Sequence, residues 1–337
     1  MSDYLEQART YIDNLPPIGK AAVAGGAGFV IYLHYKWLSS RPRRSPYIQD
    51  FEKDLVYLCQ FPRSNAVPNL SPFCLKLETW LRIADIKYKN VENFPVTYRS
   101  KEGTLPFIEL NGVEYPDSGL AIRDLANVLQ KQSLEAHLNE EQRSTAVAFE
   151  HLVEQSLWPA FLKFREQHVD ELVALQPQLF GPLNKLYRLI ARSLITSNTE
   201  TKLFHNGIGK HSDENIIRIS EEDLFALSQF LNTRHYLLGF KATKLDAAAF
   251  GVLAQIVYLP FDTPQKKYIE TKCPNLKEYC DRIKNRYWPD WDEATKKFSM
   301  KSDWKRKPHS PGSIYNGSTT KSINGGSIIN GGSIKNA

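Results

Sequence analysis

Residues 104–125 read TLPFIELNGVEYPDSGLAIRDL, and this stretch decides the fold. Two short apolar runs, Phe107–Leu110 and Val113–Tyr115, flank Asn111-Gly112, a pair that is typical of a two-residue β-hairpin turn. From Ser118 to about Gln130 the apolar residues recur at helical spacing. The stretch therefore predicts two antiparallel strands followed at once by a helix.

The residues upstream of this hairpin predict a β-α-β unit. Residues 54–61 (DLVYLCQF) are an apolar run of β-type residues, and 86–91 are a short strand candidate. Between them Ser71 is a good N-cap, and Pro72 opens a segment, FCLKLETWLRIA, with helical periodicity. Residues 54–132 are therefore expected to form one α/β domain with the order β-α-β and then β-β-α.

From about Asn139 the pattern changes to long helices with almost no strand signal, and it stops near Met300. Residues 139–300 therefore predict an all-helical second domain. Its expected helices cover residues 140–167, 169–198, 220–236, 243–258, 264–271 and 274–286.

Composition excludes several classes of protein. The chain has 337 residues, of which 42% are hydrophobic and 24% charged, as in ordinary globular proteins and unlike collagen or coiled coils. The four cysteines form no C-x-x-C pair and no zinc-type spacing, so we expect no metal and a reducing compartment. The net charge of +6 is concentrated near the two ends, which argues against a nucleic-acid-binding domain and suits a body near an anionic membrane.

The N-terminal part contains an apolar stretch. Residues 21–33 (AAVAGGAGFVIYL) carry no charge, and the run to Leu38 reaches 18 residues, the short end of a spanning helix. We expect residues 21–38 to be a single-pass membrane anchor between an N-terminal segment, 1–20, and a linker, 39–53. A cleaved or transit signal and a soluble Gly/Ala-rich arm are the alternatives.

The basic residues just after the predicted anchor give its orientation. Arg41, Arg43 and Arg44 predict a cytoplasmic body by the positive-inside rule. At the other end, residues 301–337 are a basic Gly/Asn/Ser tail that cannot bury a core, and they are expected to be disordered.

Four short motifs resemble the glutathione S-transferase fold. Ser71-Pro72-Phe73-Cys74 at a strand-to-helix transition, Leu105-Pro106-Phe107 before the hairpin and Asp117-Ser118 after it resemble its thioredoxin-like domain. Thr243-Lys244-Leu245-Asp246 resembles the capping box of the buried helix in its C-terminal domain. The resemblance implies a thioredoxin-like N-terminal domain followed by an all-helical glutathione S-transferase C-terminal domain.

Longer segments are similar to one branch of this fold. SPFCLKLETWLRIADIKY, TLPFIELNG and YPDSGLAIRDL closely resemble the failed axon connections family, metaxin-related proteins implicated in axon development. The resemblance implies a membrane-tethered protein that acts in axon development as a scaffold or adaptor. It also implies glutathione as a possible ligand and a homodimer as a possible assembly.

The resemblance also assigns site residues. Ser71 would donate a hydrogen bond to the glutathione thiolate. A cis Pro106 would position Leu105, whose backbone would pair with the cysteinyl group, while Asp117 and Ser118 would hold the γ-glutamyl group.

Each of these residues also has a structural alternative. Ser71 and Ser118 could only cap their helices, and Cys74 and Tyr57 are expected in the core. The loop 62–70 is long, and it either admits a different ligand or obstructs glutathione. Arg63 in this loop is expected to be solvated. The segment 288–291 is expected to pack the last helix on the body. The aromatic residues Trp158, Phe161 and Phe164 are expected to pack between the domains, and the alternative is that they line a hydrophobic acceptor site.

Three functions follow from these observations. The first is glutathione conjugation or thiol transfer through Ser71, the second a scaffold that keeps the fold without the chemistry, and the third a metaxin-like part of a membrane import complex. The scaffold is favoured because the sequence shows neither a base nor an activating cation beside Ser71.

Overall fold

The computed structural model describes residues 6, 10–39, 45–92, 98–177, 192, 196, 198–303 and 305. The predicted tail, 301–337, therefore lies outside the described residues from 306 onward. So do residues 1–5 and 7–9 of the N-terminal segment, residues 40–44 of the linker with its three arginines, and residues 178–191 of the predicted helix 169–198.

A four-stranded sheet forms the core of the first domain. Its strands are β1 (Val56–Cys59), β2 (Tyr88–Asn90), β3 (Phe107–Leu110) and β4 (Val113–Pro116), in the order β2-β1-β3-β4. Strands β1 and β2 are parallel, and the other pairs are antiparallel. The β3–β4 turn is the predicted one, because Asn111 and Gly112 both have positive φ, 51° and 76°.

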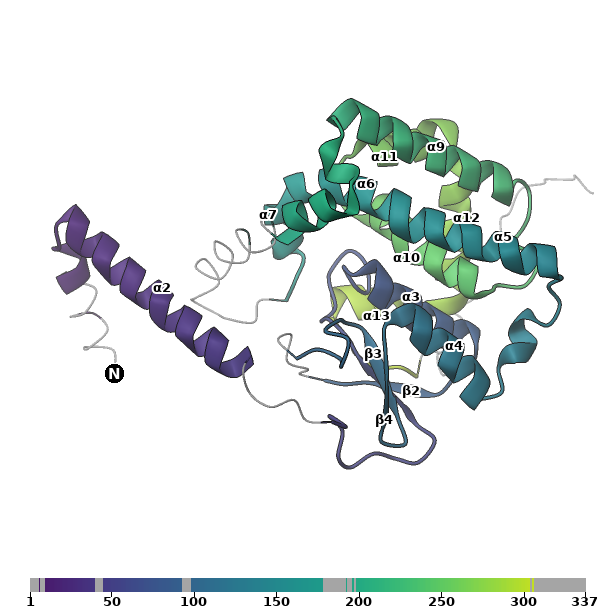
Figure 1. Ribbon diagram of the computed structural model, residues 1–337, viewed down its shortest axis with the longest axis horizontal. Coiled ribbons are helices and arrows are strands. Elements are labelled where there is room, and N and C mark those ends of the chain that lie inside the picture. The colour runs from purple at the N-terminus through teal and green to yellow at the C-terminus, as the bar shows by residue number, and fades with distance from the viewer. Residues whose placement is uncertain are drawn as a thin grey trace, which may run out of the picture.

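Two helices cover one face of this sheet. Helix α3 (Pro72–Ile83) begins at the predicted N-cap, and α4 (Ser118–Val128) follows β4 directly. Figure 1 shows both helices between the sheet and the helical domain. The β-α-β and β-β-α order predicted from the sequence is therefore confirmed.

The helical domain follows a short 3-10 turn, η1 (Gln132–Glu135). The predicted helix 140–167 is interrupted by a π-helical turn between α5 and α6, and α7, at the start of the predicted helix 169–198, ends at Ala174. In chain order the elements are α5 (Glu140–His151), η2 (Leu152–Leu157), α6 (Trp158–Arg165), η3 (Glu166–His168), α7 (Val169–Ala174), η5 (Ile208–Lys210), α9 (Asp213–Leu231), α10 (Lys244–Tyr258), α11 (Pro264–Lys272), α12 (Pro274–Tyr287) and α13 (Trp291–Lys296).

The predicted helices 243–258, 264–271 and 274–286 agree with α10, α11 and α12 to within one residue at each end. Helix α10 begins after Thr243 with the predicted capping box, in which Thr243 and Asp246 bond each other's backbone N–H groups. Helix α9 begins seven residues before the predicted 220, because Ser212 caps it. Helix α13 was not predicted, although Trp288 and Trp291 pack in the core as expected, at 1% and 6% exposure.

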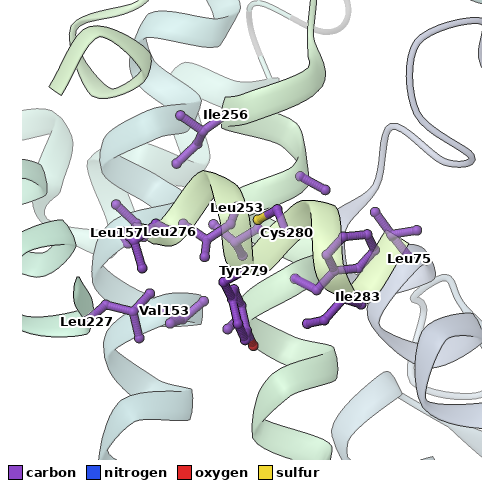
Figure 2. Close-up of a cluster of buried hydrophobic side chains, with 14 of the residues drawn as sticks. Leu75, Val153, Leu157, Leu227, Leu253, Ile256, Leu276, Tyr279, Cys280 and Ile283 are labelled. Carbon is purple, nitrogen blue, oxygen red and sulfur yellow. The ribbon is translucent and has the colours of Figure 1, made fainter. Parts of the chain in front are cut away.

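The hydrophobic core of the helical domain extends into the first domain, whose sheet also has a core of its own. Figure 2 shows Leu75 of α3 in one buried cluster with side chains from η2, α10 and α12, including Val153, Leu253 and Tyr279. All four are fully buried. The first domain therefore packs into the second through an apolar interface that is continuous with the helical core.

Residues 17–39 form a single helix, α2 (Pro17–Ser39), but the predicted anchor is wrong. Across the described part of the chain, no helix combines the length and the apolar character that crossing a membrane requires. Apart from Val23, residues 21–28 are all glycine or alanine and add little hydropathy, while His34 and Lys36 interrupt the end of the run. The prediction of a single-pass membrane protein with a cytoplasmic body is overturned with it.

A close contact fixes the approach of α10 to α3. Gly251 lies against the first turn of α3, where a Cβ atom would be only 2.5 Å from the carbonyl oxygen of Pro72. Because that oxygen is part of the backbone, it cannot rotate away. Only glycine therefore permits this helix separation.

We predict that Gly251→Ala lowers the free energy of unfolding by about 1–3 kcal/mol, the usual cost of overpacking. Chemical denaturation of the full chain would measure the loss. Gly26→Ala is the matched control, since Gly26 is helical and has no atom within 4 Å of the added Cβ. Equal unfolding free energies for the Gly251→Ala variant and the wild-type protein would contradict this account of the contact.

Candidate functional site

Ser71, the predicted catalytic residue, is the N-cap of α3. Its Oγ accepts a hydrogen bond from the backbone N–H of Cys74 at 3.4 Å. Its own N–H donates to Oδ1 of Asn69 at 2.9 Å. Ser71 thus caps α3, as the structural alternative predicted. Its role as a hydrogen-bond donor to a thiolate stays a prediction.

Cys74 and Tyr57 are core residues, as expected. Cys74 is fully buried, and burial raises the pKa of its thiol to about 12, so it carries no thiolate at neutral pH. Tyr57 is 8% exposed, and its hydroxyl accepts a hydrogen bond from the N–H of Glu52.

The loop 62–70 is held on the helical domain. Its backbone contacts three separate elements there: the N–H of Asn65 donates to the Leu175 carbonyl, Gln255 donates to the Asn69 carbonyl, and Arg165 donates to the Leu70 carbonyl. Each of these three bonds is 2.9 Å long. The loop that precedes Ser71 is thus fixed at three points along its length.

The prediction that Arg63 is solvated is wrong. Its side chain is 1% exposed, and it forms a bidentate pair with the Glu78 carboxylate at 2.6 and 2.7 Å. Its Nε also donates to the carbonyl of Ser299 at 3.0 Å. Arg63 can be buried because Glu78 of α3 neutralises its charge and the carbonyl of Ser299 accepts a further hydrogen bond from it.

Glu78 is the centre of a buried polar network that the sequence did not indicate. Besides Arg63, its carboxylate accepts hydrogen bonds from Gln60, Tyr88 and Asn90. Burial alone would raise the pKa of Glu78, but Arg63 and then Arg82 outweigh it and hold that pKa well below its usual range. The carboxylate therefore stays ionised inside the protein.

Arg82 connects this network to the C-terminal segment. Its guanidinium pairs with both oxygens of Asp290 at 2.5 and 3.0 Å, and it lies 3.6 Å from the centre of the Trp288 ring. Glu78 and Arg82 are four residues apart on one helix, a spacing visible in the sequence. Their burial was not visible, because it depends on residues about 200 positions away.

We predict that Glu78→Gln lowers the free energy of unfolding by about 3–5 kcal/mol at pH 7, since it leaves two buried arginines without this counter-ion. The depressed pKa of Glu78 also makes its contribution pH-dependent. That contribution is complete above the unfolded-state pKa of about 4.3 and declines as pH falls below it. Denaturation curves between pH 7 and pH 3 would measure both effects.

A surface carboxylate provides the control for this experiment. Glu222 forms an exposed pair with Arg218 at 3.9 Å, so Glu222→Gln should change stability by less than about 0.5 kcal/mol. If both variants lose the same free energy, the network does not contribute what its burial implies.

The Leu105–Pro106 peptide bond is cis, as predicted. Both residues are buried and lie directly before β3. The pairing of the Leu105 backbone with a cysteinyl group stays a prediction.

Asp117, not Ser118, caps α4. Its backbone has a positive φ of 61°, and its Oδ1 accepts hydrogen bonds from Gly119 at 2.8 Å and from Leu120 at 3.0 Å. Ser118 is the first residue of the helix and is 3% exposed. Asp117 and Ser118, the two residues predicted to hold the γ-glutamyl group, thus lie together at the start of α4. The Asp117 carboxylate already accepts hydrogen bonds from two of the backbone N–H groups there.

An ion cluster between the domains borders this helix start. Lys76 of α3 donates to Glu150 at 2.8 Å and to Glu154 at 2.5 Å. Burial alone would lower the pKa of Lys76, but Glu154 and Glu150 outweigh it and raise that pKa. A Cβ atom on Gly119 would lie 3.7 Å from the Lys76 ammonium, which places the cluster beside the start of α4.

The aromatic residues of α6 pack between elements, as the structural alternative states. Phe161 and Phe164 are 1% and 6% exposed, and half-buried Trp158 packs edge-on against Phe73 of α3 with ring centres 6.5 Å apart. These contacts bring α6 to the start of α3.

Arg165, at the end of α6, supplies a cation that the sequence did not place near Ser71. Its guanidinium donates to the carbonyl of Leu70, the residue before Ser71, and lies 5.2 Å from the centre of the Trp158 ring. Its buried Nε has no hydrogen-bond partner, and no carboxylate pairs with it among the described residues. Burial lowers the pKa of Arg165 to about 10, so it remains charged at neutral pH.

Within the described ranges, no group of three or more His, Cys, Asp and Glu side chains is arranged to hold a metal ion. The polar groups at the starts of α3 and α4 form the candidate site.

The sheet order, the cis-proline and the two helix starts define a protein of the glutathione S-transferase fold. The family description "Glutathione S-transferase N-terminal domain" matches residues 72–171, and "Glutathione S-transferase, C-terminal domain" matches residues 220–283. Helical residues of the second domain are thus included in the first match.

Individual relatives narrow this class. "Failed axon connections" of Drosophila melanogaster is 38% identical over 263 residues, which are 74% of this chain and 62% of that protein. Metaxin-2 of Mus musculus is 24% identical over 65% of this chain and 83% of that protein. The chain belongs to the metaxin-related, glutathione S-transferase-like family that includes failed axon connections, and it spans less than two thirds of the Drosophila relative.

A bacterial enzyme is also similar. "Isoprene-epoxide–glutathione S-transferase" of Rhodococcus sp. (strain AD45) is 28% identical over 66% of this chain and 94% of that protein.

Proposed function

We propose that this protein acts in axon development as an adaptor of the failed axon connections type, and that it uses the transferase fold without transferase chemistry. Similarity to the Drosophila relative, whose name describes an axonal defect, supports the axonal part. A homodimer of the transferase type is part of the proposal.

The observation that carries the adaptor part is that Asp117 and Ser71, two of the residues expected to hold glutathione, accept hydrogen bonds from the chain itself. Oδ1 of Asp117 accepts hydrogen bonds from the backbone N–H groups of Gly119 and Leu120. A ligand carboxylate at this helix start would need the same two donors. Oγ of Ser71 accepts from Cys74 at the other helix start. A site whose polar groups are satisfied internally gains little by binding a polar ligand.

A second function, glutathione transfer, is favoured by Arg165. This arginine lies beside Leu70 without a carboxylate partner in the described part of the chain, and a cation near Ser71 would favour a thiolate. The similarity to the Rhodococcus enzyme supports the same alternative. Ser71 would then donate its hydroxyl proton to the thiolate, and Arg165 would stabilise the negative charge.

Calorimetric titration of glutathione into the full chain separates the two functions. We expect no saturable heat up to several millimolar, because the helix-start donors are occupied. Asp117→Ala and Arg165→Gln are the diagnostic variants. Millimolar or tighter binding that either substitution abolishes would favour the transferase instead.

A rescue experiment tests the axonal role and the chemistry together. We expect the wild-type chain and Ser71→Ala to restore axon connections equally in flies that lack the Drosophila relative, since an adaptor needs no hydroxyl there. Ser71→Thr, which keeps an N-cap hydroxyl, controls for loss of folding. Rescue by wild type and Ser71→Thr but not by Ser71→Ala would favour catalysis, and failure of the folded wild-type chain would contradict the axonal role.

A further inference from the structure

A small cavity lies on the α4 side of the interface between the two domains. It has a volume of about 360 Å³ and is bordered by α4, η1, the start of α5 and the first residue of α10. Figure 1 labels α4, α5 and α10, the three helices that contribute its cationic side chains together with Lys131. None of the site residues discussed above lines this cavity.

The cavity gathers positive charge. Arg123 of α4, Lys131, Arg143 of α5 and Lys244 of α10 all line it. None of these four cations forms an ion pair with another residue that the structure describes. Grouping them raises the free energy of the unliganded protein, because like charges repel each other.

One carboxylate of the chain enters this cationic group. Glu135 lines the cavity, and its Oε1 accepts a hydrogen bond from the backbone N–H of Lys244 at 3.0 Å. The Glu135 carboxylate thus lies at the N-terminus of α10, the positive end of the helix dipole, and is itself one of the groups that line the cavity. Counted over the lining residues, one carboxylate and four cations give a net charge of +3. Glu150, which does not line the cavity, also interacts electrostatically with Lys244 and Arg123.

The floor of the cavity is apolar. Trp80 and Ile122 line it and are 3% and 2% exposed, and Ala126 and Leu134 complete the wall. A cavity of this volume lies at the lower end of the range for small-molecule sites. A basic pocket of this volume suits a compact anion better than it suits an extended polymer.

We propose that this cavity binds a small anion that carries at least two phosphoryl groups. Arg123 and Arg143 can each present two parallel N–H groups to phosphoryl oxygens, and Lys131 and Lys244 add point charges. A diphosphoryl group supplies about three negative charges at neutral pH, opposite in sign and similar in number to the net charge of the lining residues. The apolar floor leaves room for an organic part of the ligand.

Calorimetric titration of inorganic pyrophosphate into the full chain tests the proposal. We expect saturable one-to-one binding that is at least ten-fold tighter than the binding of orthophosphate. Arg123→Gln/Arg143→Gln should weaken pyrophosphate binding at least ten-fold. Both arginines are exposed, so the double variant should keep the wild-type unfolding temperature.

A charge-matched double variant is the control. Lys267→Gln/Lys272→Gln removes two exposed cations from α11, which does not border the cavity, and it should change the affinity less than two-fold. Equal weakening by the two double variants would reveal non-specific attraction and overturn the proposal. Absence of saturable binding at several millimolar pyrophosphate would overturn it as well.

Discussion

The ionised carboxylate of Glu78 is the constraint on which much of this structure depends. A charge that leaves water must be neutralised and hydrogen-bonded, and here the partners come from the residues around β1, from β2 and from α3 itself. Arg82 extends the network to Asp290 beyond α12. The sheet domain can thus be complete only when a segment from the far end of the chain lies against it.

Local signals were sufficient to predict most of the elements. The Asn111-Gly112 turn, the Ser71 cap and the Thr243 capping box each depend on residues within a few positions, and all three are present. The start of α9 had a local signal too, Ser212 followed by two acidic residues, which sequence reasoning did not use.

The remaining features depend on distant residues. Arg63 reads as a solvated loop residue until Glu78 and Ser299 are placed around it. Arg165 is near Ser71 only because α6 packs on the start of α3 through Trp158 and Phe73. The apolar run before residue 39 differs from the prediction for another reason: it lacks charge, but its Gly- and Ala-rich residues give it too little hydropathy for a membrane span.

The contact between Gly251 and Pro72 has a consequence for movement. A helix pair packed backbone to backbone, with Leu75 in the shared core, has no space for hinge or sliding motion between the two halves. The starts of α3 and α4 therefore keep one orientation towards the helical domain. A partner that binds across both halves meets a preformed surface, and it does not have to compensate for the entropy of domain closure.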